Sequence, residues 1–172
     1  MTTTIALSAL LALLTQEAGP VKVGQKVPDF TVTDTAGKTW TLAELRKRTS
    51  SEVVSLTFWC TFCHSCRMMD AKFQTLADEH RGKAAVVGLD ASALDTAEKI
   101  DAFARDRKFT VPVFLDAGKA ADLFGVTKTT TTLVVDKDGV LRYQGRFEGA
   151  QAALKAVLAG EEVKVKETVP AG

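Results

Sequence analysis

The sequence predicts an α/β fold in which helices flank a mixed central sheet. Short apolar segments rich in β-branched residues alternate along the chain with segments whose apolar residues recur three and four positions apart, the spacing of a helix face. Such alternation is typical of parallel strands joined by helices. Two turn sequences, DTAG at 34–37 and DKDG at 136–139, each lie between two strand-like segments and predict antiparallel hairpins. A chain of 172 residues suggests one domain with short ends.

The elements of the first half follow from local patterns. A turn that contains glycine joins the two short strands of an N-terminal hairpin, and Thr41 followed by Glu44 has the spacing of a capping box that begins a helix. The run VVSLTF has the composition of a buried strand, and a longer segment with helical spacing follows it. The expected elements are strands at 30–33 and 38–40, a helix at 41–48, a strand at 53–58 and a helix at 63–80.

The second half continues the alternation and closes with the second hairpin. The segment AAVVGL is an apolar strand, and the next segment places apolar residues on one helix face. The expected elements are a strand at 84–89, a helix at 97–107, a strand at 111–115, a short helix at 120–124, strands at 131–135 and 140–143, and a closing helix at 150–158.

The two ends of the chain differ from the middle. The run IALSALLALL at 5–14 is too short to span a membrane but fits the hydrophobic region of a signal peptide. No Lys or Arg precedes it, so a helix packed on the domain is the alternative. We interpret residues 1–18 as a signal peptide. Export to the periplasm or another extracytoplasmic space follows, with no stable membrane span in the mature form. Residues 159–172 are expected to form a polar tail.

Charge excludes one class of partner. Lys and Arg number 22 against 21 Asp and Glu, which gives a formal net charge of +1. The basic residues are scattered and form no stripe along any element. A nucleic-acid partner is therefore not expected.

The three cysteines of the chain fall within seven residues, at Cys60, Cys63 and Cys66. They lie between the end of a predicted strand and the start of a predicted helix, where unpaired backbone N–H groups and the helix dipole stabilise a thiolate. The thiolate is the reactive form of cysteine. The cluster has three interpretations: a redox pair, a haem attachment sequence, or a three-thiolate metal site.

The redox interpretation assigns a role to each thiol. Cys63, at the helix start, attacks a disulfide, and Cys66, one turn further, resolves the mixed disulfide. His64 adds positive charge beside Cys63 or is an ordinary exposed residue. Trp59 is expected at the wall of the site. Cys60 has three open interpretations: a small buried side chain, a third redox thiol, or a ligand.

Other chemistries use the same residues. Cys60, Cys63 and His64 form a literal C-x-x-C-H, the attachment sequence of a c-type haem. Alternatively, Cys60, Cys63 and Cys66 bind Zn, Cu(I) or an iron–sulfur cluster. Thr57 and Cys60 have the T-x-x-C spacing of peroxiredoxins, but the peroxidatic cysteine of that superfamily aligns nearer Cys66.

Several motifs in order carry a resemblance that spans roughly residues 22–158. The sequence resembles the TlpA-like, redoxin-type thioredoxins that bacteria export. The resemblance implies a thioredoxin fold with an N-terminal hairpin extension and a thiol–disulfide oxidoreductase that requires no cofactor. It also implies protein thiols or disulfides and a reducing electron donor as partners. The matching segments are GQKVPDF at 24–30, DTAGK at 34–38, FW at 58–59, the CxxCR of 63–67, FGV at 124–126, TTLVVD at 131–136 and the DG of 138–139.

The sequence departs from this family at three positions. Cys60 stands where a small residue is usual, and Thr57 stands where thioredoxins have a buried acid. Thr130 stands where the family has a cis-proline that faces the cysteines. A cis bond before a residue other than proline costs about 2.5–4 kcal/mol, so we expect the loop 128–130 to be trans or strained. In the family, this proline shapes the substrate groove and keeps metals away from the thiols, so its replacement favours the metal interpretation.

We expect the mature protein to begin near Gly19 when the full chain is produced in a host that exports it. The reason is that the run at 5–14 has no place in the predicted order of strands and helices. Intact mass spectrometry of protein from a Gram-negative periplasm measures the N-terminus. A full-length chain whose first 18 residues resist proteolysis would contradict the expectation.

Overall fold

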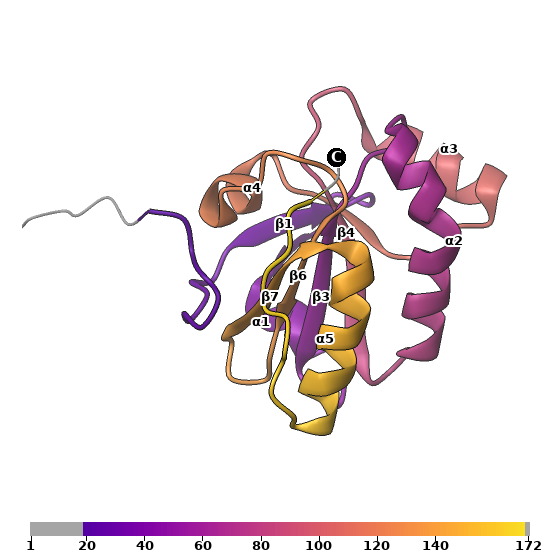
Figure 1. Ribbon diagram of the computed structural model, residues 1–172. Helices are drawn as coiled ribbons and strands as arrows, with labels where there is room; N and C mark the ends of the chain where they lie inside the picture. Colours follow the sequence, from indigo (N-terminus) through magenta and orange to yellow (C-terminus); the bar gives the residue numbers. More distant parts are fainter. Residues whose placement is uncertain (1–18, 171–172) are drawn as a thin grey trace, which may run out of the picture.

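The computed structural model describes residues 19–170, which form a seven-stranded mixed sheet with helices on both faces (Figure 1). The expected signal peptide, 1–18, lies outside the described residues. The strands run β2-β1-β5-β4-β3-β6-β7 across the sheet. Their bounds are β1 (Thr31–Asp34), β2 (Thr39–Thr41), β3 (Val53–Phe58), β4 (Ala84–Asp90), β5 (Val113–Leu115), β6 (Thr131–Val135) and β7 (Leu141–Arg146).

The pairing confirms the mixed sheet and both hairpins. Strands β3, β4 and β5 are parallel to one another, whereas β6 joins β3 antiparallel and β1 joins β5 antiparallel. The hairpin β1–β2 therefore extends the sheet beyond β5, and the hairpin β6–β7 closes the other side. This is the thioredoxin fold with an N-terminal hairpin extension, as the sequence predicts.

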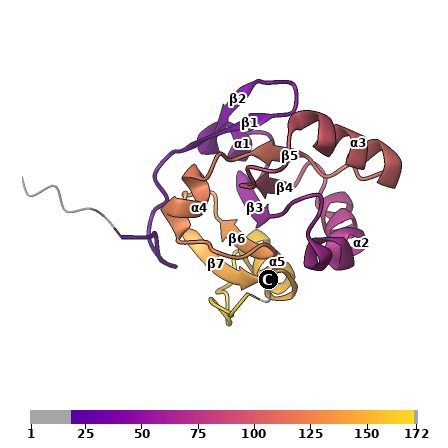
Figure 2. The same cartoon turned by 90° about the horizontal axis from the view of Figure 1, so that it is seen from above.

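Helices divide the core into two layers. Buried side chains of α2, α3 and α5 pack in one apolar cluster, and those of α1 and α4 pack in the other. Figure 2 shows α4 and α2 on opposite sides of the central strands. The helices are α1 (Leu42–Arg46), α2 (His64–Glu79), α3 (Ala97–Arg107), α4 (Lys119–Phe124) and α5 (Phe147–Ala159).

Strand β3 lies between β4 and β6 in the sheet, and all six of its residues are buried. Val54, Leu56 and Phe58 face the cluster that contains α1 and α4, and Val53 faces the cluster that contains α2. Thr57, which stands where thioredoxins have a buried acid, lies on the second face and its hydroxyl pairs with that of Thr132 at 3.1 Å. A neutral hydroxyl pair therefore replaces a titratable group in the core.

Local signals located most elements but not every boundary. Both hydrogen bonds of the capping box between Thr41 and Glu44 are present at the start of α1. Helix α5 begins three residues before the expected position 150. Phe147 explains the difference, because its buried ring packs against Phe73 with centroids 5.6 Å apart and fixes the first turn.

The C-terminal segment, expected to be a polar tail at 159–172, lies against β7 over part of its length. Backbone hydrogen bonds join it to β7, and Val163 is buried. The hydroxyl of Thr168 pairs with that of Tyr143 at 2.7 Å and accepts from the backbone N–H of Arg146 at 2.7 Å. The segment thus covers an edge strand that would otherwise expose unpaired backbone groups.

The helices of residues 19–170 include none that is both long and apolar enough to cross a membrane.

Candidate active site

Residues 60–66, which we call the cysteine turn, lie where three elements meet at one edge of the sheet. β3 ends at Phe58, and α2 begins four residues after Cys60. The loop before β6 runs opposite, because β6 pairs antiparallel with β3. The backbone N–H of Thr130 donates to the carbonyl of Phe58 at 2.7 Å and fastens this loop to the end of β3. The fold therefore brings residues 127–130 beside the cysteines.

Cys63 is the N-cap residue of α2 and the most accessible of the three thiols. Its sulfur accepts the backbone N–H of Cys66 at 3.4 Å and lies 3.1 Å from the hydroxyl of Thr129. Partial burial alone raises the pKa of Cys63, but the hydrogen bonds from Thr129 and from the Cys66 backbone outweigh it. The pKa of Cys63 is therefore lowered, and the thiolate is favoured.

Cys66 and Cys60 are buried, with 0% and 3% of their surfaces exposed. Burial is the main cause that raises the pKa of the Cys66 thiol. Burial also raises the pKa of Cys60 to about 11, and the nearby charges of Cys63, Asp90 and Asp95 add to it. Three identical groups therefore differ in reactivity because of where the fold places them.

The three sulfur atoms all lie within 4.8 Å of one another. Cys60 is thus part of the same cluster as the expected redox pair, and all three thiols are free. His64, which is exposed at the first position of α2, is not part of this cluster of potential ligand atoms in the described chain.

Trp59, the residue before Cys60, packs in the core next to the cysteine turn. It is buried, and its indole N–H donates to Asp70 at 2.8 Å. Its ring stacks on Phe109 with centroids 5.5 Å apart and meets Phe103 edge-on at 5.0 Å. Trp59 is also among the residues that line the groove beside the cysteines. Aromatic packing of this kind holds the end of β3 in place.

Thr130, at the position of the family's proline, has a strained backbone. Residues 19–170 contain no cis peptide bond, and Thr130 has φ +63°, an uncommon conformation for a β-branched residue. The expectation that this loop is trans or strained is confirmed. The residue next to it, Thr129, is the one whose hydroxyl reaches Cys63.

A groove of about 640 Å³ lies between the cysteine turn and this loop. Cys60 and Cys63 border it, and Phe62 leaves 51% of its surface exposed beside them. An apolar groove with a few polar groups is the usual form of a binding site. The rest of the lining is mainly apolar or hydroxyl-bearing and includes Phe58, Leu89, Ala91, Val126, Thr127 and Thr129.

Two acidic residues next to the cysteine turn, Asp90 and Asp95, were not expected from the sequence. Asp95 accepts the backbone N–H of Thr61 at 2.7 Å and its hydroxyl at 2.5 Å. Burial alone raises the pKa of Asp95, but hydrogen bonds from Asp90 and Thr61 outweigh it and lower the pKa.

Asp90 is the member of this pair whose pKa is raised. Burial, and then the hydrogen bond to Asp95, raise the pKa of Asp90 to about 7. Its Oδ1 accepts the backbone N–H of Ser92 at 2.8 Å, and its Oδ2 is buried. Asp90 ends the apolar strand β4, and its position at the carboxyl end of a parallel strand was the signal available in the sequence.

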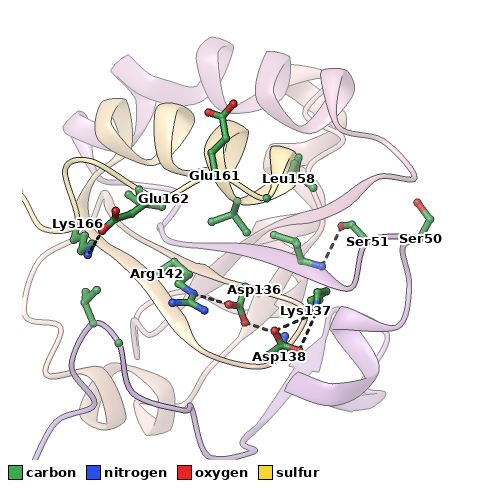
Figure 3. Close-up of a pocket in the computed structure, with 16 residues that line it drawn as sticks. Ser50, Ser51, Asp136, Lys137, Asp138, Arg142, Leu158, Glu161, Glu162 and Lys166 are labelled. Carbon is green, nitrogen blue, oxygen red and sulfur yellow. Dashed lines mark hydrogen bonds and ion pairs between the residues drawn. The ribbon is translucent and has the colours of Figure 1, made fainter.

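A second cavity, of about 820 Å³, lies at the opposite end of the sheet (Figure 3). Several of its polar groups bond to one another: Asp136 pairs with Arg142 at 2.5 Å and accepts the backbone N–H of Asp138. These bonds close the turn between β6 and β7. No reactive thiol borders this cavity, so the groove at the cysteines is the candidate active site.

The chain is similar to several known proteins. Residues 23–144 match the model of the AhpC/TSA family. The chain is 31% identical to the thioredoxin-like protein YneN of Bacillus subtilis, over 71% of this chain and 70% of YneN. It is 29% identical to the thiol-disulfide oxidoreductase ResA of Bacillus thuringiensis, over 80% of this chain and 78% of ResA. Among solved structures it is similar to the peroxidoxin BcpB of Mycobacterium tuberculosis, with a TM-score of 0.63 and 29% identity, over 81% of this chain and 95% of that chain.

We expect limited alkylation of the reduced protein to label Cys63 before Cys60 and Cys66. Its lowered pKa gives it more thiolate at neutral pH, and the other two sulfurs are buried. Peptide mass spectrometry at short reaction times identifies the labelled residue. Faster labelling of Cys60 would show that the assignment of the attacking thiol is wrong.

We expect Thr129→Val to shift the alkylation profile of Cys63 to higher pH, because it removes a hydroxyl that stabilises the thiolate. A hydrogen bond with a net contribution of about 0.5–1.5 kcal/mol corresponds to a rate roughly 2–10-fold lower below the pKa. Thr129→Ser, which keeps the hydroxyl, is the matched control. Identical profiles for the valine and serine variants would remove Thr129 from the site.

Proposed function

The chain belongs to the AhpC/TSA family, and we propose that it is a thiol–disulfide oxidoreductase that acts on protein disulfides through Cys63 and Cys66. One observation carries the proposal. The sulfur of Cys63 caps α2 beside an apolar groove and has a lowered pKa, while Cys66 lies buried within 4.8 Å behind it. An accessible thiolate next to a buried thiol is the arrangement that thiol–disulfide exchange requires.

The reaction proceeds in two exchanges. The Cys63 thiolate attacks one sulfur of a substrate disulfide; the substrate S–S bond breaks, and the departing thiolate takes up a proton. Cys66 then loses its proton and attacks the sulfur of Cys63, which releases the second substrate thiolate. The protein is left with a Cys63–Cys66 disulfide, and two electrons have passed to the substrate. A reducing electron donor is needed to return the pair to the dithiol.

The groove supports a protein substrate. Its apolar lining and the exposed ring of Phe62 offer contacts to an extended peptide beside the attacking sulfur. The loop at 127–130 forms the opposite wall and supplies the hydroxyl that stabilises the Cys63 thiolate. The substrate is thus recognised by apolar side chains next to its disulfide.

Peroxide reduction and haem attachment fit the site less well. With a pKa of about 11, Cys60 is almost entirely a protonated thiol at neutral pH, whereas a peroxidatic cysteine reacts as a thiolate. The hydroxyl of Thr57 is engaged with Thr132 inside the sheet. A haem held by Cys60 and Cys63 requires both sulfurs to reach the porphyrin, yet Cys60 is buried.

We place the reaction outside the cytoplasm. The support is the apolar run at 5–14, which fits a signal peptide. In an oxidising compartment a dithiol becomes oxidised unless a dedicated donor reduces it. An exported protein of this kind therefore requires a partner that delivers electrons.

We expect Cys63→Ser to lower disulfide-reductase turnover by about 10³-fold or more, as is usual when an enzyme loses its nucleophile. Cys66→Ser should instead slow resolution, so that a mixed disulfide through Cys63 accumulates with a model protein substrate. Insulin reduction measures turnover, and non-reducing electrophoresis with mass spectrometry measures the trapped species. If Cys63→Ser keeps its turnover, the proposed function fails.

A further inference from the structure

Thiol–disulfide exchange uses two thiols, and the structure holds a third. Cys60 is buried at the end of β3, and its sulfur lies within 4.8 Å of both sulfurs of the redox pair. It also borders the groove together with Cys63.

One backbone hydrogen bond within the cluster is directed at a cysteine sulfur. The N–H of Cys66 donates to the sulfur of Cys63 at 3.4 Å. N–H groups directed at sulfur compensate charge on thiolates and are typical of the surroundings of metal-bound cysteines.

We propose that the reduced protein binds one zinc ion through Cys60, Cys63 and Cys66, with a fourth position open to the groove. Zinc lies about 2.3 Å from each thiolate, so the sulfurs of a tetrahedral site are about 3.8 Å apart. The sulfurs here lie within 4.8 Å of one another, and shifts of less than about 1 Å close the site. Three protein ligands with one open position is a known form of zinc site.

Charge favours a divalent ion over a monovalent one. Three thiolates and Zn²⁺ leave one net negative charge, whereas Cu(I) leaves two, and two of the three sulfurs are buried. Among the described residues no His, Asp or Glu joins the three sulfurs as a ligand. Water in the groove therefore takes the fourth position, within reach of the Thr129 hydroxyl that already contacts Cys63.

Binding exchanges protons and no electrons. Each thiol that is protonated loses its S–H bond, its proton passes to solvent, and a Zn–S bond forms. The ion occupies both thiolates of the redox pair, so the zinc-bound protein cannot attack a disulfide. The inference thus goes beyond the proposed function, because exchange needs two thiols and the zinc site needs all three.

The test is an anaerobic titration of the reduced, full protein with Zn²⁺ in competition with a chromophoric chelator, and with Co²⁺ as a spectroscopic probe. We expect one ion per chain, thiolate-to-cobalt charge-transfer bands and the intense visible bands of tetrahedral Co²⁺. Zinc should also protect Cys63 from alkylation. Binding of no ion, or six-coordinate Co²⁺, overturns the proposal.

Variants of Cys60 separate a three-thiolate site from chelation by the redox pair alone. Cys60→Ser and Cys60→Ala should each lower zinc affinity by more than the 10–100-fold that loss of a group outside the ligand shell costs. Cooperative thermal unfolding checks the fold of each variant. Wild-type affinity in either folded variant excludes Cys60 as a ligand and overturns the proposal.

A second measurement needs no variant. X-ray absorption of the zinc-loaded wild type counts the sulfur neighbours of the ion, and we expect three; a count of two overturns the site. Insulin-reductase turnover of the metal-free protein is measured beside it. If the protein reduces insulin but binds no zinc, the proposed function stands and the zinc site is rejected. If it binds zinc but does not reduce insulin, the zinc site stands and the proposed function is rejected.

Discussion

The hydrogen bond from the Thr130 backbone N–H to the Phe58 carbonyl, 2.7 Å long, is the constraint on which the site depends. It continues the antiparallel register of β3 and β6, in which Thr57 lies opposite Thr132, past the end of the strand. A shift of that register by one residue would turn every side chain to the other face. The bond therefore fixes which hydroxyl of the loop faces Cys63, and the positive φ of Thr130 is the conformation in which the loop holds that position.

Reactivity at the site follows from burial and hydrogen bonding rather than from residue type. The same thiol has a lowered pKa at Cys63, where hydrogen bonds outweigh partial burial, and a raised pKa at Cys60 and Cys66, where burial dominates. The attacking thiol must be ionised, and the resolving thiol reacts only after the mixed disulfide has formed. The end of a buried strand followed at once by a helix N-terminus supplies both environments within seven residues.

Sequence reasoning found the parts of the site that are encoded locally. The capping box at Thr41, the buried strand β3 and the start of α2 at the CxxC are short-range patterns, and each is present in the structure. Thr129 and the Asp90–Asp95 pair could not be found in this way. They reach the cysteines only because β6 and β4 flank β3 in the sheet, and the periodicity of one segment carries no information on which strands become its neighbours.

The acidic pair connects the two chemistries of the cysteine turn. Asp95 holds the backbone and the hydroxyl of Thr61, the residue after Cys60, so it fixes the turn that brings Cys60 to the other sulfurs. Its negative charge opposes a thiolate at Cys60 when no cation is present. A divalent cation among the three sulfurs offsets two of the three thiolate charges, so the repulsion from Asp95 is weaker than it would be against three bare thiolates. The surroundings that make Cys60 a poor nucleophile are thus compatible with its role as a metal ligand.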